Sequence, residues 1–105
     1  MQEVTIADLA AARLTGAVVV DVRETDEYVE AHVPGAIHIP LGLLPHRLDE
    51  VPDGEPVYVI CHSGVRSQYG AQVLAAAGRT ALSVAGGTSA WIHARHPVQT
   101  GVERG

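Results

Sequence analysis

Several residue types are scarce or missing in this sequence of 105 residues. It has one cysteine and no phenylalanine, and all seven of its basic residues are arginine. A single cysteine excludes a disulfide within the chain, so the disulfide-stabilised folds of small secreted proteins do not apply. Aromatic residues make up only 4% of the chain, so Val, Ile, Leu and Ala have to build the core. A chain of this length has room for one core, and we expect residues 1–105 to form a single domain.

Positive charge and long apolar runs are also scarce. Seven arginines against twelve acidic residues give a net charge of −5. A nucleic-acid-binding surface is normally basic, so this balance argues against nucleic acid as a partner. No apolar stretch approaches membrane-spanning length, and the N-terminus lacks the pattern of a signal peptide. We therefore expect a cytoplasmic protein with a reduced cysteine, no membrane partner and, by default, a monomeric state.

Strand and helix patterns alternate along the chain. Strands are expected at 3–5, 17–22, 36–39, 57–60 and 81–84, and helices at 6–14, 26–31, 67–77 and 89–95. Thr5, Thr25 and Thr88 are the expected N-caps, and Thr5 forms a capping box with Asp8. Residues 41–48 are weakly helical, 49–56 form a loop, and 98–105 form a loose C-terminal tail. This alternation predicts an α/β fold with a mostly parallel sheet.

The only cysteine lies between the 57–60 strand and the 67–77 helix. A loop before a helix directs backbone N–H groups inward and carries the positive end of the helix dipole. This setting stabilises a thiolate, which is the nucleophilic form of cysteine. A free cysteine is also a common small core residue, but a core residue has no need of anion-binding surroundings. We therefore predict that Cys61 is a nucleophile.

Two other segments are expected beside this loop. In open parallel sheets, ligands bind beyond the carboxyl ends of the strands. Asp21 to Arg23 end the 17–22 strand, and Gly86 and Gly87 follow the 81–84 strand. Both segments should therefore lie at the same end of the sheet as Cys61. The glycine pair suits a turn packed closely against the loop, where side chains would intrude.

Four motifs occur in the order typical of a known family. They read Asp-Val-Arg at 21–23, Glu-Ala-His-Val-Pro-Gly-Ala-Ile-His-Ile-Pro at 30–40, Cys-His-Ser-Gly-Val-Arg-Ser at 61–67 and Gly-Gly-Thr-Ser-Ala-Trp at 86–91. Together they span nearly the whole chain, which resembles the rhodanese-like sulfurtransferases in their single-domain form. The resemblance implies a central, mostly parallel five-stranded sheet with helices on both faces. It also implies that Cys61 carries a persulfide during turnover, without a cofactor.

The chemistry of the residues agrees with sulfur transfer. The Cys61 thiolate would take the outer sulfur from a small donor such as thiosulfate or a persulfide. Cyanide, a small thiol or an acceptor protein would then remove that sulfur, and two such half-reactions predict ping-pong kinetics. The backbone N–H groups of the loop would cradle the charged sulfur. The loop residues are His62, Ser63, Gly64, Val65, Arg66 and Ser67.

The charged and polar side chains near the loop are expected to have different roles. Arg23 matches the family position of an arginine that meets the donor's sulfonate, and its planar group suits oxyanions. Arg66 binds the donor or pairs with an acid such as Asp21, and we favour the pairing. Asp21 would then support the loop and not act as an acid catalyst. His62 and Ser63 are expected at the rim of the pocket, where they affect substrate choice.

Other functions fit the sequence less well. Cysteine phosphatases and arsenate reductases also use a loop from Cys to Arg, but the phosphatase signature has five intervening residues. Only four lie between Cys61 and Arg66, which makes a cradle better suited to one sulfur atom than to a phosphate. His93 and His96 have no Cys or acid cluster beside them, so we expect no metal. A persulfide carrier or a protein-interaction module with little turnover is the more serious alternative.

Overall fold

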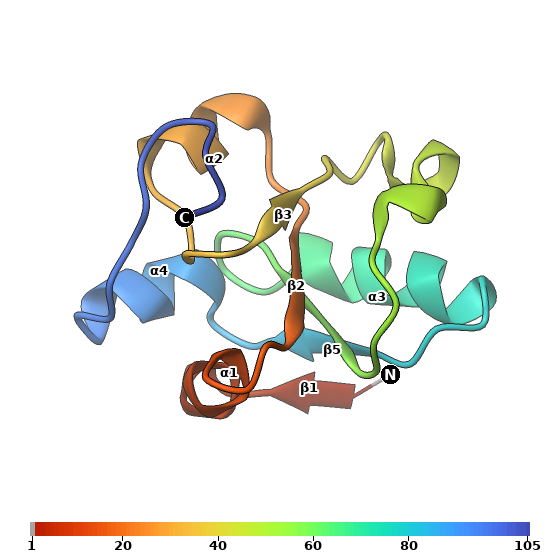
Figure 1. The fold of residues 1–105 in the computed structure, drawn as a ribbon, viewed down its shortest axis with the longest axis horizontal. Helices are drawn as coiled ribbons and strands as arrows, with labels where there is room; N and C mark the ends of the chain where they lie inside the picture. The colour runs from red at the N-terminus through yellow and green to blue at the C-terminus, as the bar shows by residue number, and fades with distance from the viewer. Residues whose placement is uncertain (1) are drawn as a thin grey trace.

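The computed structural model describes residues 2–105, and five strands in it form one sheet. The order across the sheet is β1-β5-β4-β2-β3, and all four neighbouring pairs are parallel (Figure 1). The predicted α/β fold with a five-stranded parallel sheet is confirmed. The strands are β1 Gln2–Val4, β2 Val18–Asp21, β3 Ile37–His38, β4 Val57–Ile60 and β5 Ala81–Val84.

Four α-helices within residues 2–105 cover the sheet, and they are α1 Ile6–Arg13, α2 Thr25–Glu30, α3 Arg66–Ala76 and α4 Gly87–His93. Successive side chains of a strand point to opposite faces, so each central strand contributes to two cores. Val57 and Val59 of β4 pack with Leu74 of α3 on one face. Ile60 packs with Trp91 of α4 on the other face, in a cluster that also includes residues of α1 and α2. The expectation of helices on both faces is confirmed.

The helix starts agree with the predicted caps in one case out of three. The Thr5 hydroxyl accepts a hydrogen bond from the Asp8 N–H, and the Asp8 carboxylate accepts one from the Thr5 N–H, as a capping box requires. Thr25 is instead the first residue of α2, which Glu24 caps. Thr88 lies inside α4, because that helix already begins at Gly87. No helix among residues 2–105 is long and apolar enough to cross a membrane.

The segment between β3 and β4 contains short turns in place of the weak helix. Two 3-10 turns, Leu44–His46 and Leu48–Glu50, replace the helix predicted at 41–48 and the start of the loop predicted at 49–56. Pro45 explains the interruption, because it has no N–H to donate within a helix. Leu44 is fully buried against the α3 face of the sheet, so this segment completes the core on that side.

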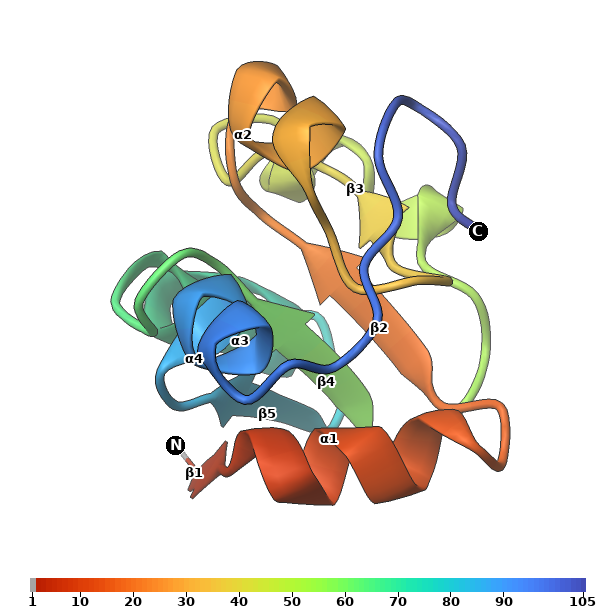
Figure 2. The ribbon, with the colours of Figure 1, turned by 90° about the vertical axis from the view of Figure 1, so that its left-hand side faces the viewer.

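The prediction of a loose C-terminal tail was wrong. Residues 98–105 run back past α2, where the blue end of the chain lies beside the orange helix (Figures 1 and 2). His32 and Gln99 exchange two backbone hydrogen bonds of 2.9 and 2.8 Å. The imidazole of His32 is fully buried, and its Nε2 lies 2.7 Å from the Glu103 carbonyl oxygen. Backbone groups make most of these contacts, so the side-chain pattern of the tail does not reveal them.

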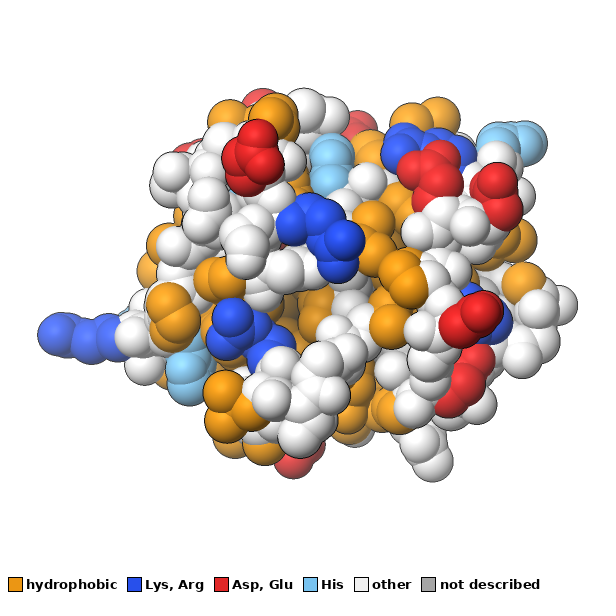
Figure 3. All heavy atoms as spheres, in the orientation of Figure 1, with side chains coloured by type: hydrophobic (Ala, Val, Ile, Leu, Met, Phe, Trp, Pro, Cys, Tyr) orange, Lys and Arg blue, Asp and Glu red, His pale blue; other side chains and the backbone are white. Residues whose placement is uncertain are grey.

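The surface has no single dominant charge on the face shown in Figure 3. Basic and acidic side chains are interspersed there among apolar ones (Figure 3). The net charge of −5 is therefore not offset by a broad basic area on this face.

Candidate active site

Cys61 lies where β4 ends, with its sulfur enclosed by the loop that follows. Its side chain is buried, and Sγ accepts a hydrogen bond of 3.1 Å from the Gly64 N–H. The Ser67 Oγ lies 3.5 Å from the same sulfur. The loop turns back so tightly because Gly64 has a φ of +104°, which is accessible to glycine and strained for other residues. The predicted strand, loop and helix around Cys61 are therefore present.

The first turn of α4 orients the peptide groups of this loop. The Thr88 N–H donates to the Cys61 carbonyl at 2.8 Å, and the Ser89 N–H donates to the His62 carbonyl at 3.0 Å. In a trans peptide the N–H points opposite to the C=O. With both carbonyls turned toward α4, the N–H groups of His62 and Ser63 turn away from it. The helix thus helps to direct the amides of the loop toward its interior.

Gly87 makes this close approach possible. A Cβ atom at this position would overlap the carbonyl oxygen of Cys61 and lie 2.6 Å from that of His62. Its φ of +57° also lies in the left-handed region, as does the φ of +79° at Gly86. The glycine pair thus lies directly against the loop. This is the position expected for residues that follow the 81–84 strand of a parallel sheet.

The surroundings of the sulfur favour its ionised form. Burial raises the pKa of Cys61, but hydrogen bonds from the Ser67 hydroxyl and from the backbone of Ser67, Gly64 and Ser63 act in the opposite direction. Their combined effect lowers the pKa of Cys61 below the ordinary value of a thiol. A larger share of the side chain is therefore thiolate at neutral pH, and the thiolate is the nucleophile.

Arg66 pairs with an acid, as favoured, but the acid is Glu27 and not Asp21. Its Nη1 and Nη2 donate to the two carboxylate oxygens of Glu27 at 2.7 and 2.8 Å. Such paired, charge-assisted bonds are strong and geometrically specific. The ion pair connects the start of α3 to α2, so it holds the end of the loop in place. The sequence pattern does not single out Glu27 for this role.

Acid is expected to weaken this connection. The Arg66 guanidinium lowers the pKa of Glu27 from 4.5 to about 2. A carboxyl group whose pKa is lower in the folded state stabilises that state at any pH above its pKa in the unfolded chain. This contribution disappears as the pH falls through the pKa of the folded state. We expect Glu27→Gln to be less stable than the wild type at pH 7, with the difference shrinking between about pH 4.5 and 2. Urea unfolding across this range measures it, and a constant difference would contradict the assignment.

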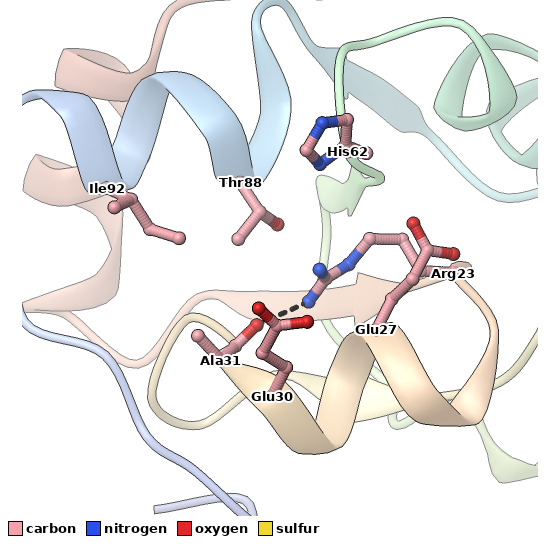
Figure 4. Close-up of a pocket in the computed structure, with 7 residues that line it drawn as sticks. All are labelled: Arg23, Glu27, Glu30, Ala31, His62, Thr88 and Ile92. Atoms are coloured by element: carbon pink, nitrogen blue, oxygen red, sulfur yellow. Dashed lines mark hydrogen bonds between the residues drawn. The ribbon is translucent and has the colours of Figure 1, made fainter.

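Arg23 has less freedom to bind a donor than the sequence suggested. It is buried, and its Nε and Nη2 donate to the Asp21 carboxylate at 3.0 and 2.9 Å. Nη2 also donates to the Ala31 carbonyl oxygen at 2.7 Å, as the dashed line in Figure 4 marks. Only Nη1 has no hydrogen-bond partner in the described part of the chain. Asp21 therefore holds Arg23 in place, and it does not pair with Arg66 as expected.

A pocket of about 250 Å³ opens between α2 and α4, beside the loop (Figure 4). The Cys61 sulfur is not among its walls, and the pocket meets the loop at His62. Thr88 points into the pocket, and its Oγ1 is buried without a hydrogen-bond partner among residues 2–105. The unpaired hydroxyl of Thr88 could not be predicted from the sequence pattern. The lining residues are Arg23, Glu27, Glu30, Ala31, His62, Thr88 and Ile92.

A second, more open depression shares His62 and Ile92 with this pocket and also includes Ser63. The two residues expected at the pocket rim therefore line surface depressions next to the loop. Among the residues that the structure describes, no group of three or more His, Cys, Asp or Glu side chains comes together as a metal site. The arrangement offers a nucleophilic sulfur, inward-pointing amides and a small adjoining pocket.

The sequence model of the protein family described as the Rhodanese-like domain matches residues 5–94. The chain belongs to the rhodanese-like family. This rhodanese-like protein is 40% identical over 74 residues to the "Putative sulfur carrier protein YrkF" of Bacillus subtilis, a match that covers 70% of this chain and 40% of YrkF. It is 36% identical over 81 residues to the thiosulfate sulfurtransferase GlpE of Coxiella burnetii, covering 76% of this chain and 75% of GlpE.

Solved structures agree with this membership. The crystal structure of a rhodanese-related protein from Thermoplasma volcanium superposes with a TM-score of 0.86 at 28% identity. The superposition covers 98% of this chain and all of that one. The predicted family and fold are therefore confirmed, and the chain belongs to the rhodanese-like sulfurtransferase family. It spans less than half the length of YrkF.

Proposed function

We propose that this rhodanese-like protein transfers sulfane sulfur through a persulfide on Cys61. The main support for this proposal is the position of the Cys61 sulfur. It accepts the Gly64 N–H inside a loop of inward-pointing amides, and its pKa is lowered. The same amides can hold the negative charge of the reacting sulfur before and after transfer.

The reaction has two balanced steps. The Cys61 thiolate attacks the outer sulfur of the donor and forms a new S–S bond. The bond inside the donor breaks, and its electron pair leaves with the remainder, which is sulfite if the donor is thiosulfate. A nucleophilic acceptor then attacks the terminal sulfur of the persulfide, and Cys61 leaves again as a thiolate. Neither step needs a metal, an oxidant or a reductant.

The pocket beside His62 suits a small donor. The polar groups that line it without a hydrogen-bond partner in the described chain include the Nη1 of Arg23 and the hydroxyl of Thr88. Asp21 and Arg66 balance the charges of Arg23 and Glu27, while Glu30 has no ion-pair partner among residues 2–105. These charges leave no excess positive charge for the dianion thiosulfate, because the unpaired carboxylate of Glu30 makes their sum negative. Thiosulfate and a less charged organic persulfide are therefore the two donors to compare.

A persulfide carrier is the second candidate function. Three apolar side chains in or near the active loop are well exposed, namely Val65 (60%), Tyr69 (57%) and Ile92 (48%). An acceptor protein that covers them would bury apolar surface while bringing its own thiol to Cys61. YrkF, whose name describes a sulfur carrier, is similar to this chain in sequence. The exposed apolar side chains therefore favour a protein, and not a small molecule, as the acceptor of the sulfur.

Steady-state kinetics test the proposal and separate its two forms. With each donor, initial rates are measured against cyanide, a small thiol and a protein thiol as acceptors. Parallel double-reciprocal lines, which indicate ping-pong kinetics, are expected for an enzyme of this mechanism. Slow turnover with both small acceptors and rapid turnover with the protein thiol would indicate a carrier. Intersecting lines with all acceptors would contradict a persulfide intermediate.

The unpartnered hydroxyl of Thr88 provides a prediction about the pocket. Thr88→Val replaces this hydroxyl with a methyl group of similar size. We expect unchanged or higher stability, because an unsatisfied buried hydroxyl costs about 1–3 kcal/mol. We also expect the donor KM to rise about 3- to 10-fold, since one hydrogen bond contributes about 1 kcal/mol. Urea unfolding and steady-state kinetics measure both, and an unchanged donor KM would show that the hydroxyl does not meet the donor.

A further inference from the structure

Two buried serine hydroxyls lie behind the Cys61 sulfur. Ser67 belongs to the first turn of α3 and Ser83 to β5, and both are fully buried. Their Oγ atoms are 2.7 Å apart, and the Ser67 Oγ lies 3.5 Å from Cys61 Sγ. The sulfur and two hydroxyls therefore form a continuous chain of hydrogen-bonding groups that crosses from β4 through α3 to β5.

Packing alone does not explain the hydroxyl of Ser83. The residue lies in the interior of the sheet, because β5 pairs with β1 on one side and with β4 on the other. A buried hydroxyl is costly unless it is hydrogen-bonded, and β-branched apolar residues suit such strand positions better. In the described chain the only side-chain hydrogen bond of Ser83 is the one to Ser67. A polar residue within the otherwise apolar run 81–84 was a signal available in the sequence.

The hydrogen positions in this chain depend on the charge of the sulfur. Each hydroxyl has one hydrogen and can donate only once. A neutral Cys61 thiol can donate to Ser67, which then donates to Ser83. A thiolate can only accept, so the Ser67 hydrogen turns toward the sulfur and the Ser67 oxygen becomes free to accept from Ser83. Chains of hydrogen bonds polarise one another, so a bond from Ser83 strengthens the bond from Ser67 to the thiolate.

We propose that Ser83 is a positioning residue for the Cys61 thiolate, because it donates to Ser67 and thereby directs the Ser67 hydroxyl toward the sulfur. Its effect on turnover rests on the proposed function, since both half-reactions use this thiolate. In the first it is the nucleophile, and in the second it is the leaving group that receives the electron pair of the broken S–S bond. A better-stabilised thiolate leaves more readily.

A matched pair of variants isolates the hydroxyl. Ser83→Thr keeps it, while Ser83→Val has nearly the same shape without it. The rate of Cys61 alkylation by iodoacetamide is measured against pH, which reports the ionisation of the thiol without any sulfur transfer. We expect the Cys61 pKa to be higher in Ser83→Val than in Ser83→Thr, with alkylation about 3- to 10-fold slower at neutral pH. Thr80→Ala removes an exposed hydroxyl just before β5 and should behave as the wild type.

A double-mutant cycle tests whether Ser83 acts through Ser67. If it does, adding Ser83→Val or Ser83→Ala to Ser67→Ala should produce no further rise in the Cys61 pKa. Equal pKa values in folded Ser83→Thr and Ser83→Val, or an undiminished effect in the Ser67→Ala background, would overturn the proposal. If the valine is too large for the site, Ser83→Ala against the wild type gives the same comparison. A pKa effect in a protein that never forms a persulfide would support this inference while refuting the proposed function.

Discussion

Cys61→Ser is expected to abolish sulfur transfer and leave the fold intact. The serine hydroxyl is neutral at neutral pH, so the variant lacks the anionic nucleophile and cannot form a persulfide. We expect kcat to fall by on the order of 10⁴-fold or more, as for the loss of other catalytic nucleophiles. The replacement is nearly isosteric, and its oxygen can still accept the Gly64 N–H that now meets the sulfur. Steady-state assays with both donors measure the loss.

The unfolding transition provides the control for this variant. A change of less than about 2 kcal/mol is expected, because a single buried atom is exchanged and its hydrogen bonds are kept. A folded Cys61→Ser protein that retains more than a hundredth of the wild-type kcat would contradict the assignment of the nucleophile. Since the chain has no other cysteine, no second thiol can replace Cys61 in such an experiment.

Gly87→Ala should have the second largest effect, on both stability and activity. The new Cβ would overlap the Cys61 carbonyl oxygen and lie 2.6 Å from the His62 carbonyl oxygen. The first turn of α4 would have to retreat from the loop and release the two carbonyls that it now orients. We expect a stability loss of roughly 3 kcal/mol or more from overpacking and left-handed strain together. A loop displaced by about 1 Å should lower kcat about 100-fold.

Gly78→Ala separates strain from overlap. Gly78 also has a left-handed φ, +87°, but an added Cβ there would have nothing within 4 Å. We expect about 1–2 kcal/mol of destabilisation from the backbone alone, with unchanged kcat. Urea unfolding and turnover of the two variants give the comparison. Equal losses in both would mean that contact between α4 and the active loop does not matter for activity.

Local patterns predicted the fold and the centre of the site well. The apolar run before Cys61, the small and polar loop, and the helix after it follow directly from neighbouring residues. Parallel strands align their carboxyl ends, so the positions of Asp21 and Gly87 beside the loop also followed from the order of elements. The structure shows these segments together through the parallel pairing of β2, β4 and β5.

Partners of charged side chains were harder to predict. Nothing in the spacing of the acidic residues between positions 21 and 30 selects one of them as the partner of Arg66. The structure pairs Arg66 with Glu27, although Asp21, Glu24, Asp26 and Glu30 lie in the same segment. Arg23 folds back on Asp21, two residues away, and this leaves only Nη1 for a ligand. Such pairings depend on side-chain directions in three dimensions. The C-terminal tail was missed for a related reason, because backbone groups hold it to His32.

Mass spectrometry of Cys61 tests the central claim most directly. The purified protein is incubated with thiosulfate or an organic persulfide, and its intact mass and the Cys61 peptide are measured before and after an acceptor is added. A persulfide mechanism predicts a gain of one sulfur atom on Cys61, its loss on addition of cyanide or a thiol, and no gain in Cys61→Ser. No gain with either donor, or an equal gain in Cys61→Ser, would contradict it.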